Sequence, residues 1–249
     1  MKTPDLKLRL QYYDMLDSTN DFALELIKND RPREGTVIMA GFQVKGRGQR
    51  VNSWQSDKDS NVTISIILYP AFLAPEKQFF LSMALSLAVQ ELLGGFRINA
   101  DIKWPNDIYV GEKKIAGMLI ENAVMSSQII HSVVGLGLNV NQERFAGDIP
   151  NPTSMKIETG RDFPLSEVAE KLLGISEKWL KSLYMEEYTS IKEKYEQNLL
   201  FINMPSTFKQ EDKVFKGTIQ GVNENGQILI MVENNLLLTF NFKDIEFCF

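Results

Sequence analysis

The chain has one cysteine, Cys248, and one histidine, His131, among its 249 residues. A single cysteine cannot form a disulfide within the chain, and no Cys/His cluster exists that could hold zinc. We therefore expect no metal-ligating residues and a reducing compartment, the cytoplasm. His131 lies within a strand-like pattern, where a packed histidine is more common than a catalytic one.

An excess of basic residues and long hydrophobic runs are also missing. Lys and Arg total 27 against 32 Asp and Glu, a net charge of −5, so no basic field covers the whole chain for nucleic-acid binding, although a local basic patch stays compatible with this balance. No run approaches the roughly 18 apolar residues of a spanning helix, and the first ten residues lack the apolar core of a signal peptide. We expect neither a nucleic-acid nor a membrane partner.

The composition, 44% apolar and 24% charged, is that of an ordinary globular protein, and the length allows one large domain or one large plus one small. A capping residue near Asp17 or Ser18 predicts a short amphipathic helix that ends near Asn29. Residues 75–93 are apolar nearly all round, which predicts a buried helix that Gly94 and Gly95 end. Strand-like segments complete this half at residues 36–42, 61–69, both sides of a turn within 101–121, and 128–140.

The second half changes character twice. Residues 141–164 carry three of the nine prolines and no clear period, so they predict a long loop of a kind that is often functional. Residues 165–200 return to helical spacing and predict two helices over one face of the sheet. From Pro205 short strands alternate with turn residues, and hairpin turns are expected at residues 225–226 and 234–235. The pattern predicts an α/β (α+β) domain at 1–203 and a small barrel-like domain at 204–249.

Residues 101–121 hold the densest chemistry of the chain. Lys103, Asp107 and Lys114 fall within 12 residues, around a turn-forming Pro-Asn-Asp, so the chain can fold back and present both cations near one point. That arrangement suits the binding of an anion. An ordinary hairpin with solvated lysines has the same pattern.

Two further segments each have a feature that suits an anion. Gly46 and Gly48 let backbone N–H groups approach a ligand in a loop that also carries Lys45, Arg47 and Arg50. Neither a Walker loop nor a dinucleotide fingerprint is present, and alone the loop is also typical of a flexible surface turn. A third strand ends in Gly-x-Gly-x-Asn at 135–139. Convergence of three such features is what an active site requires.

Six motifs, in order along the chain, together resemble the biotin protein ligases. They are Ser18-Thr19-Asn20, Gly46-Arg47-Gly48 with Trp54, Lys103-Trp104-Pro105-Asn106-Asp107, Lys114-Ile115-Ala116-Gly117, Gly135-Leu136-Gly137-Leu138-Asn139 and Pro152-Thr153-Ser154. The resemblance covers nearly the whole chain from about Tyr13. It implies a catalytic domain of the class II aminoacyl-tRNA synthetase kind over 1–203, followed by an SH3-like barrel over 204–249. Since 17 residues precede Ser18, the chain is similar to the monofunctional type without an N-terminal DNA-binding domain.

The resemblance implies a two-step reaction. Biotin and MgATP give biotinyl-5′-AMP and pyrophosphate, and a lysine of a biotin carboxyl carrier domain then attacks the acyl carbon and releases AMP. Adenylation supplies a leaving group that a carboxylate lacks, and joining an anion to a polyanion requires positive charge from the protein. The implied ligands are biotin, ATP and Mg²⁺, the implied partner is the carrier protein, and the expected state is a monomer or weak homodimer.

The resemblance also implies roles for particular residues. The catalytic ones are Lys103 for phosphate charge, Lys114 for the biotin carboxylate and the acyl phosphate, Arg47 for loop ordering, and Asp107 for the incoming lysine, which must be neutral although its free pKa is ~10.4. The biotin contacts are Ser18, Thr19, Asn20, Gln43, Arg47, Gly48, Gln49, Lys114, Gly117 and Gly135. The ATP and adenylate contacts are Arg50, Asn52, Trp54, Lys103, Asn106 and Asn139. Structural alternatives remain: Asn139 could cap a strand end, Asp107 could stabilise its own turn, and Trp54 could pack beneath the loop.

The glycine-rich loop departs from the family pattern. Gln49, Val51 and Asn52 stand where the family often has arginine, glycine and arginine, so two charges are absent. Either Arg50 and Lys45 compensate, or the reactive intermediate is held less tightly.

Three alternative functions stay open. A lipoate or octanoate ligase of the same fold is expected to show a different arginine-glycine motif and a His-Asp pair. A non-enzymatic, biotin-sensing transcriptional regulator is disfavoured by the short N-terminal segment and the acidic balance. A catalytically dead binding module is expected to have lost Lys114, Arg47 or Asp107, and all three are present.

Overall fold

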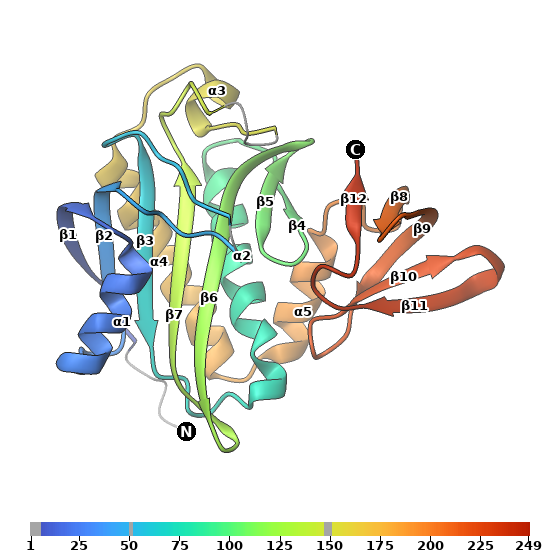
Figure 1. The fold of residues 1–249 in the computed structure, drawn as a ribbon, viewed down its shortest axis with the longest axis horizontal. Helices are drawn as coiled ribbons and strands as arrows, with labels where there is room; N and C mark the ends of the chain where they lie inside the picture. The colour runs from blue at the N-terminus through green and yellow to red at the C-terminus, as the bar shows by residue number, and fades with distance from the viewer. Residues whose placement is uncertain (1–5, 50–51, 147–150) are drawn as a thin grey trace.

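The computed structural model of the chain describes residues 6–49, 52–146 and 151–249. Its larger unit is a seven-stranded sheet in the order β1-β2-β3-β7-β6-β5-β4, with helices on both faces (Figure 1). β1 pairs with β2 in parallel, and the remaining neighbours in this order pair antiparallel. The strands are β1 (Arg9–Leu16), β2 (Thr36–Gln43), β3 (Asn61–Leu68), β4 (Asp101–Lys103), β5 (Asp107–Val110), β6 (Lys113–Met125) and β7 (Gln128–Asn139).

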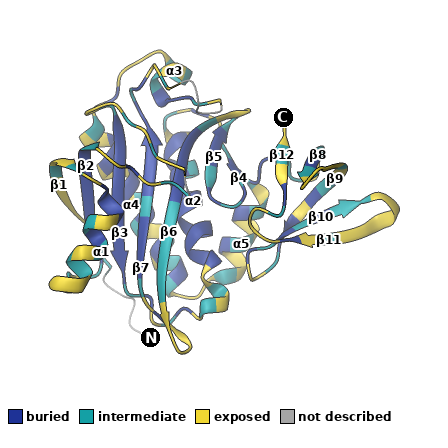
Figure 2. Cartoon of the chain, in the orientation of Figure 1, coloured by how far each residue is buried: buried dark blue, intermediate teal, exposed yellow. Residues whose placement is uncertain are grey.

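The helices divide between the two faces of this sheet. α1 (Thr19–Asn29) covers the near face in Figure 1, and α2 (Phe79–Gly95), α4 (Leu165–Tyr184) and α5 (Tyr188–Gln197) cover the far face. α2 lies between the sheet and the other two helices, which is why it is apolar all round and dark blue in Figure 2. The predictions of a buried helix and of two covering helices are confirmed. Gly94 and Gly95 are the last helical residues, and the chain turns at Arg97 with a φ of 62°.

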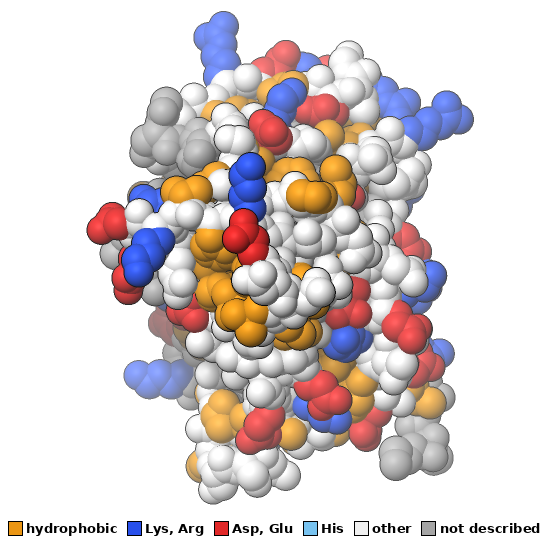
Figure 3. All heavy atoms as spheres, turned by 90° about the vertical axis from the view of Figure 1, so that its right-hand side faces the viewer, with side chains coloured by type: hydrophobic (Ala, Val, Ile, Leu, Met, Phe, Trp, Pro, Cys, Tyr) orange, Lys and Arg blue, Asp and Glu red, His pale blue; other side chains and the backbone are white. Residues whose placement is uncertain are grey.

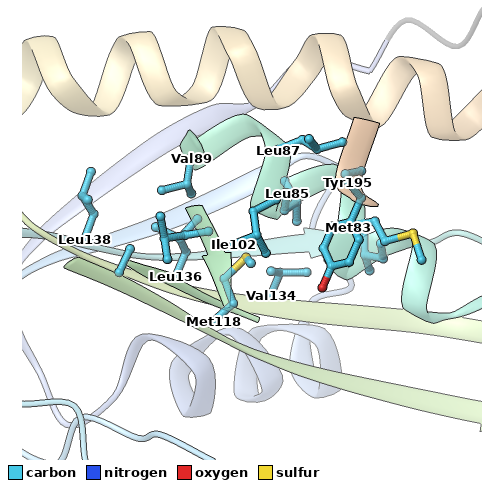
Figure 4. Packing of buried hydrophobic residues seen from close by; sticks show 14 of the residues in the cluster. Met83, Leu85, Leu87, Val89, Ile102, Met118, Val134, Leu136, Leu138 and Tyr195 are labelled. Carbon is cyan, nitrogen blue, oxygen red and sulfur yellow. The ribbon is translucent and has the colours of Figure 1, made fainter. Parts of the chain in front are cut away.

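The main core fills the space between the sheet and the far-face helices (Figure 4). Leu85 and Val89 of α2 point toward Met118, Leu136 and their neighbours on the strands. Burying each such side chain contributes about 1.5–3 kcal/mol. Because alternate residues of a strand face opposite sides, the neighbours of Leu136 in sequence are free to line the near face.

A second, five-stranded antiparallel sheet follows, in the order β11-β10-β9-β8-β12. Its strands are β8 (Pro205–Gln210), β9 (Lys213–Val222), β10 (Ile228–Val232), β11 (Leu236–Phe240) and β12 (Glu246–Cys248), with the 3-10 turn η2 (Glu233–Asn235) between β10 and β11. Both predicted hairpins are confirmed, because β9 pairs with β10 and β10 with β11. Figure 3 faces this side of the molecule, where hydrophobic surface lies among charged side chains.

The two sheets share one core. Trp104 Nε1 donates to the Gly226 carbonyl at 2.8 Å, and the Phe79 and Phe242 rings lie 5.4 Å apart. Glu196 of α5 accepts from the Val222 backbone N–H at 2.9 Å. The second sheet therefore packs directly against β4 and α2, beside the densest chemistry of the sequence.

Three short elements are absent from the sequence-based expectations. β1 is an edge strand whose residues are mostly exposed, so it has no clear apolar alternation. α3 (Met155–Thr159) lies within the expected loop and is too short to show a period, although Ser154 caps it. Pro75 begins the separate 3-10 turn η1 (Pro75–Lys77) before α2. Within the described residues, no helix is long and apolar enough to cross a membrane.

Candidate active site

A cavity of about 140 Å³ opens on the α1 face of the large sheet. The segment between β2 and β3 runs across the front of the sheet here (Figure 1). The start of α1, this segment and strands β2, β3, β5, β6 and β7 supply the walls. The lining residues are Ser18, Thr19, Asn20, Gln43, Arg47, Gly48, Gln49, Asn52, Ser53, Trp54, Ile64, Asp107, Lys114, Gly117, Met118, Leu119, Gly135, Leu136 and Gly137.

Glycines make the floor of the cavity low enough for side chains to enter. Gly117 and Gly137 face each other in the β6–β7 ladder, and a Cβ on Gly137 would lie 2.3 Å from the Trp54 indole. A Cβ on Gly135 would lie 2.3 Å from Asn20 Oδ1. Real Cβ atoms do not approach so closely, so the Gly-x-Gly segment is a packing requirement of the site.

One end of the cavity is a fixed hydrogen-bond network at the start of α1. Gln43 Oε1 accepts from the Thr19 backbone N–H at 2.8 Å and from Thr19 Oγ1 at 3.1 Å. Ser65 Oγ lies 2.7 Å from Thr19 Oγ1 and 2.6 Å from Asn20 Oδ1. Ser18 caps the helix by accepting from Asp21 N at 3.3 Å. Buried and held by one another, these groups suit a neutral ligand with donors and acceptors of its own.

The other end is charged. Lys114 Nζ lies 2.7 Å from Asp107 Oδ1, and the two side chains are 29% and 24% exposed. Lys103 stands opposite Asp107 in the β4–β5 ladder, but its ammonium lies against aromatic rings and does not line the cavity. Burial lowers the pKa of Lys103, Asp107 counteracts that shift, and Lys114 adds to it. The arrangement places two cations around one carboxylate.

Arg47 fastens the loop over the cavity. Its guanidinium donates to Asp21 Oδ1 at 2.5 Å and to the two oxygens of Glu121 at 2.8 and 3.1 Å. Burial lowers the pKa of Arg47, but its hydrogen bonds to Glu121 and Asp21 outweigh the effect of burial, so the pKa is raised. Gly48 N donates to Asn52 O at 2.8 Å, which closes the loop on itself. Arg47 is therefore a bidentate clamp between loop, helix and sheet.

Most of the predicted site residues meet in this cavity; of those that the structure describes, Lys103, Asn106 and Asn139 do not line it. Asn106 donates its amide to the Met118 carbonyl, and Asn139 Nδ2 donates to Thr153 O at 2.9 Å. Both therefore tie loops to the sheet, as in the structural alternative for Asn139, whose Oδ1 is buried without a partner in the part of the chain described. Lys103 is adjacent to the cavity, and Arg50, like Val51, falls outside the described residues.

Sequence reasoning missed several residues that build the site. Ser65, Asp21 and Glu121 fix the side chains that were predicted. Strand alternation carried a signal for Glu121, because it places residues 117, 119 and 121 on one face of β6. The ion pairs of Arg47 carried none, since its partners lie 26 and 74 residues away in sequence.

The cavity joins a neutral hydrogen-bonding end to a cationic end, on a mixed sheet that helices cover. This combination defines the class of an enzyme site that activates an anion. The family described as "Biotin/lipoate A/B protein ligase family" matches residues 12–139, and the chain belongs to this family.

Individual relatives agree with the family match. The bifunctional ligase/repressor BirA of Bacillus subtilis is 30% identical over 99% of this chain and 76% of its own length. The biotin–[acetyl-CoA-carboxylase] ligase of Paracoccus denitrificans is 26% identical over 86% of this chain and 90% of its own. The biotin protein ligase from Aquifex aeolicus, solved in complex with biotin and ATP, matches with a TM-score of 0.80 and 29% identity over 96% of this chain and 97% of that chain. The resemblance and the ligase-like α/β fold expected from the sequence are confirmed.

Proposed function

We propose that the protein is an ATP-dependent biotin protein ligase. It converts biotin and ATP into biotinyl-5′-AMP and pyrophosphate, then transfers biotin to a lysine of a biotin carboxyl carrier protein. The observation that carries the proposal is one cavity in which a fixed hydrogen-bond network meets the Lys114–Asp107 pair. The relatives reported above are biotin ligases. Their reaction needs both ends of the cavity, hydrogen bonds for a neutral ring and charge for anionic groups.

Biotin binding uses both ends of the cavity. The ureido ring, with two N–H donors and one carbonyl acceptor, meets the network of Ser18, Thr19, Asn20 and Gln43. Gly117 and Gly135 line the floor beneath the ring system, where they leave room for Lys114, Asp107 and Asn20, and Gln49 and Gly48 lie in the loop. The valeryl carboxylate then extends to Lys114.

In the first step a biotin carboxylate oxygen attacks the α-phosphorus of ATP and pyrophosphate leaves. Negative charge accumulates where the biotin carboxylate, the α-phosphate and the leaving pyrophosphate meet, so the protein must supply cations there. Lys114 neutralises the carboxylate and the new acyl-phosphate oxygen, and Lys103 neutralises the phosphates. Asn52 and Trp54 line the cavity as contacts for the adenylate, and Arg50, Asn106 and Asn139 complete the proposed nucleotide set.

In the second step the ε-amino group of the carrier lysine attacks the acyl carbon and AMP leaves. The amine must be neutral to attack, although its ordinary pKa is ~10.4. Asp107, whose carboxylate is partly exposed in the cavity, orients this amine and accepts its proton. Arg47 holds the loop closed meanwhile, which keeps water from the acyl phosphate.

The ATP is proposed to carry Mg²⁺ on its phosphates, because this ion usually binds substrate phosphates, water and one or two carboxylates. Within the described residues no group of three or more His, Cys, Asp or Glu side chains could hold a metal ion, so the ion is proposed to arrive on the nucleotide. We further propose a catalytic domain at 1–203 and an SH3-like domain at 204–249, supported by the start of a separate sheet at Pro205. A reaction that uses ATP and a carrier protein fits the cytoplasm.

Labelling of a carrier domain tests the proposal. The protein is incubated with ATP, labelled biotin and a biotin carboxyl carrier domain, and label is expected on one lysine. A carrier with that lysine changed to arginine is the control. Labelled lipoate is offered in parallel, since the family name covers both substrates. Absence of biotin transfer, or preference for lipoate, would contradict the proposal.

A further inference from the structure

The ammonium of Lys103 is enclosed by aromatic rings. Its Nζ lies 5.2 Å from the ring centroid of Tyr109, 5.1 Å from that of Phe247 and 5.8 Å from that of Phe249. Each distance lies within the ~6 Å at which a ring face attracts a cation. We call these three rings the Lys103 box.

Both sheets build the Lys103 box. Tyr109 belongs to β5 of the large sheet, Phe247 to β12 of the small one, and Phe249 follows β12. The rings of Tyr109 and Phe249 stack at 5.7 Å and 13°. Phe247 stands opposite Phe208 in the β12–β8 ladder, and their rings meet edge to face at 5.3 Å. The small sheet therefore reaches the charged end of the active site through two phenylalanines.

The Lys103 box leaves Lys103 without a contact ion pair in the described part of the chain, although Asp107 and Glu246 act on its charge from a longer distance. Within the described part of the chain, no carboxylate oxygen lies within 4.0 Å of its Nζ, whereas Lys114 Nζ contacts Asp107 at 2.7 Å. A ring face attracts a cation through its quadrupole but carries no charge to cancel it. Lys103 thus keeps its full charge beside the cavity, next to a carboxylate that is already engaged.

Asp107 is the anion that Lys103 would otherwise reach. The two residues are Cα partners in the β4–β5 ladder, a spacing that a lysine side chain spans easily. If Lys103 paired with Asp107, one cation at the phosphate end would be neutralised, and the Lys114–Asp107 pair would be disturbed. The rings hold the ammonium away from that contact.

We propose that Phe247 and Phe249 are positioning residues that hold Lys103 charged and unpaired for the phosphates of ATP. The inference rests on the proposed function and adds to it a role for the small sheet in adenylate formation. It predicts that the rings matter for ATP and not for biotin, because the proposed catalytic group that they contact is Lys103, the phosphate-directed cation.

The test is a double variant, Phe247→Leu with Phe249→Leu, in the full chain. Leucine keeps an apolar side chain and removes the ring faces. Biotin-dependent exchange of pyrophosphate into ATP is expected to show kcat/KM for ATP about tenfold lower, in line with the loss of two cation–π contacts. The Kd for biotin is expected to stay within twofold. Phe215→Leu is the matched control, since Phe215 belongs to the small sheet and packs on Phe208 and Phe240 away from Lys103.

Two further sets of variants distinguish a positioning role of the two rings from a purely structural one. Phe247→Tyr with Phe249→Tyr keeps the ring faces and is expected to restore the ATP parameters. In a Lys103→Met background, the two leucines are expected to cause no further loss. An effect equal to that of Phe215→Leu, an undiminished loss in the Lys103→Met background, or faster exchange in the leucine variant would overturn the inference. A wild type without biotin-dependent exchange would instead overturn the proposed function, and this inference with it.

Discussion

The hairpin at residues 101–121 and the loop at residues 46–54 face each other across the cavity and are held in place by different physics. This hairpin segment comprises β4, β5 and most of β6, which form backbone ladders with one another and with β7. Lys114 adds backbone bonds to Asn151 and Thr153 at 2.7 and 2.9 Å. The loop has backbone bonds of its own, such as Trp54 N to Gly46 O. Arg47 ties it to α1 and β6 through ion pairs with Asp21 and Glu121, whose side chains are 53% and 27% exposed. The residues with proposed chemical roles therefore lie in the rigid hairpin, whereas the position of the loop over the cavity depends on ion pairs.

This difference predicts how each region fails. Salt screens partly exposed ion pairs over about 8–10 Å at physiological strength but leaves a backbone ladder intact. Changes in the hairpin should remove chemistry with the fold unchanged. Changes in the loop should alter retention of the intermediate, and should do so in a salt-dependent way.

The largest effect is expected from Lys114→Ala. Removing a cation aimed at developing charge typically costs about 10²–10³ in rate. Biotin-dependent pyrophosphate exchange should fall by that factor, with the unfolding temperature little changed. Lys113→Ala is the control, because its neighbouring side chain is 55% exposed and pairs with Glu158 instead. Unchanged exchange in Lys114→Ala would remove this residue from the mechanism.

Much of the hairpin side could be predicted from the sequence, because its elements are local. Lys103, Asp107 and Lys114 lie in short strands joined by turns, and the β5–β6 ladder brings Asp107 and Lys114 together. The glycines of the Gly-x-Gly segments also predicted that another group approaches the backbone closely there. The order of the strands was not predicted, and neither was β1, whose exposed edge position carries no periodic signal.

The clamp of the loop and the Lys103 box could not be predicted. They depend on tertiary contacts between residues far apart in sequence, such as Arg47 with Glu121 and Lys103 with Phe247. A composition or a period reports which face a residue takes, but not which distant group meets it. The bond from Asn139 Nδ2 to the Thr153 carbonyl is of the same kind, and the role of Asn139 as a nucleotide contact stays a prediction.

The next effect in size concerns the floor under the loop. Gly137→Ala places a Cβ 2.3 Å from the Trp54 indole, so the indole and its loop must move. Overpacking of this kind costs about 1–3 kcal/mol. A lower unfolding temperature and weaker binding of biotinyl-5′-AMP are expected, by thermal unfolding and calorimetry. Gly174→Ala is the control: its Cβ enters open space within α4, where alanine is the better helix former. Equal results for both variants would mean that Trp54 is not held against the floor.

A smaller effect is expected from loosening the clamp. Glu121→Gln removes the bidentate partner of Arg47, a partly exposed contact worth about 1 kcal/mol. Release of biotinyl-5′-AMP should become several-fold faster, and its dependence on salt should weaken. Asp17→Asn breaks the more exposed pair with Lys45 and should change neither. Gln49 and Asn52 leave two alternatives, compensation by Arg50 and Lys45 or a loosely held intermediate, and slow release from the wild type would refute the second.

The smallest expected effect is on pH dependence, and it concerns Lys103. Burial lowers the pKa of Lys103 below its ordinary 10.5; Asp107 and Glu246 oppose this shift and Lys114 adds to it. Lys103 is charged below its folded pKa, so pyrophosphate exchange should fall as pH rises through that value, earlier than for an ordinary lysine. The unfolded chain holds more protons than the folded one between the two pKa values, so the free energy of unfolding should rise with pH there.

Lys103→Arg tests this, because a guanidinium stays charged across the whole range. The alkaline fall in exchange should move to higher pH in that variant and stay in place in Lys113→Arg, whose side chain is exposed. An alkaline fall that is the same in all three proteins would assign it to another group. The Lys103 box would then hold a cation whose charge does not limit the reaction, and the chemistry of the hairpin would rest on Lys114 alone.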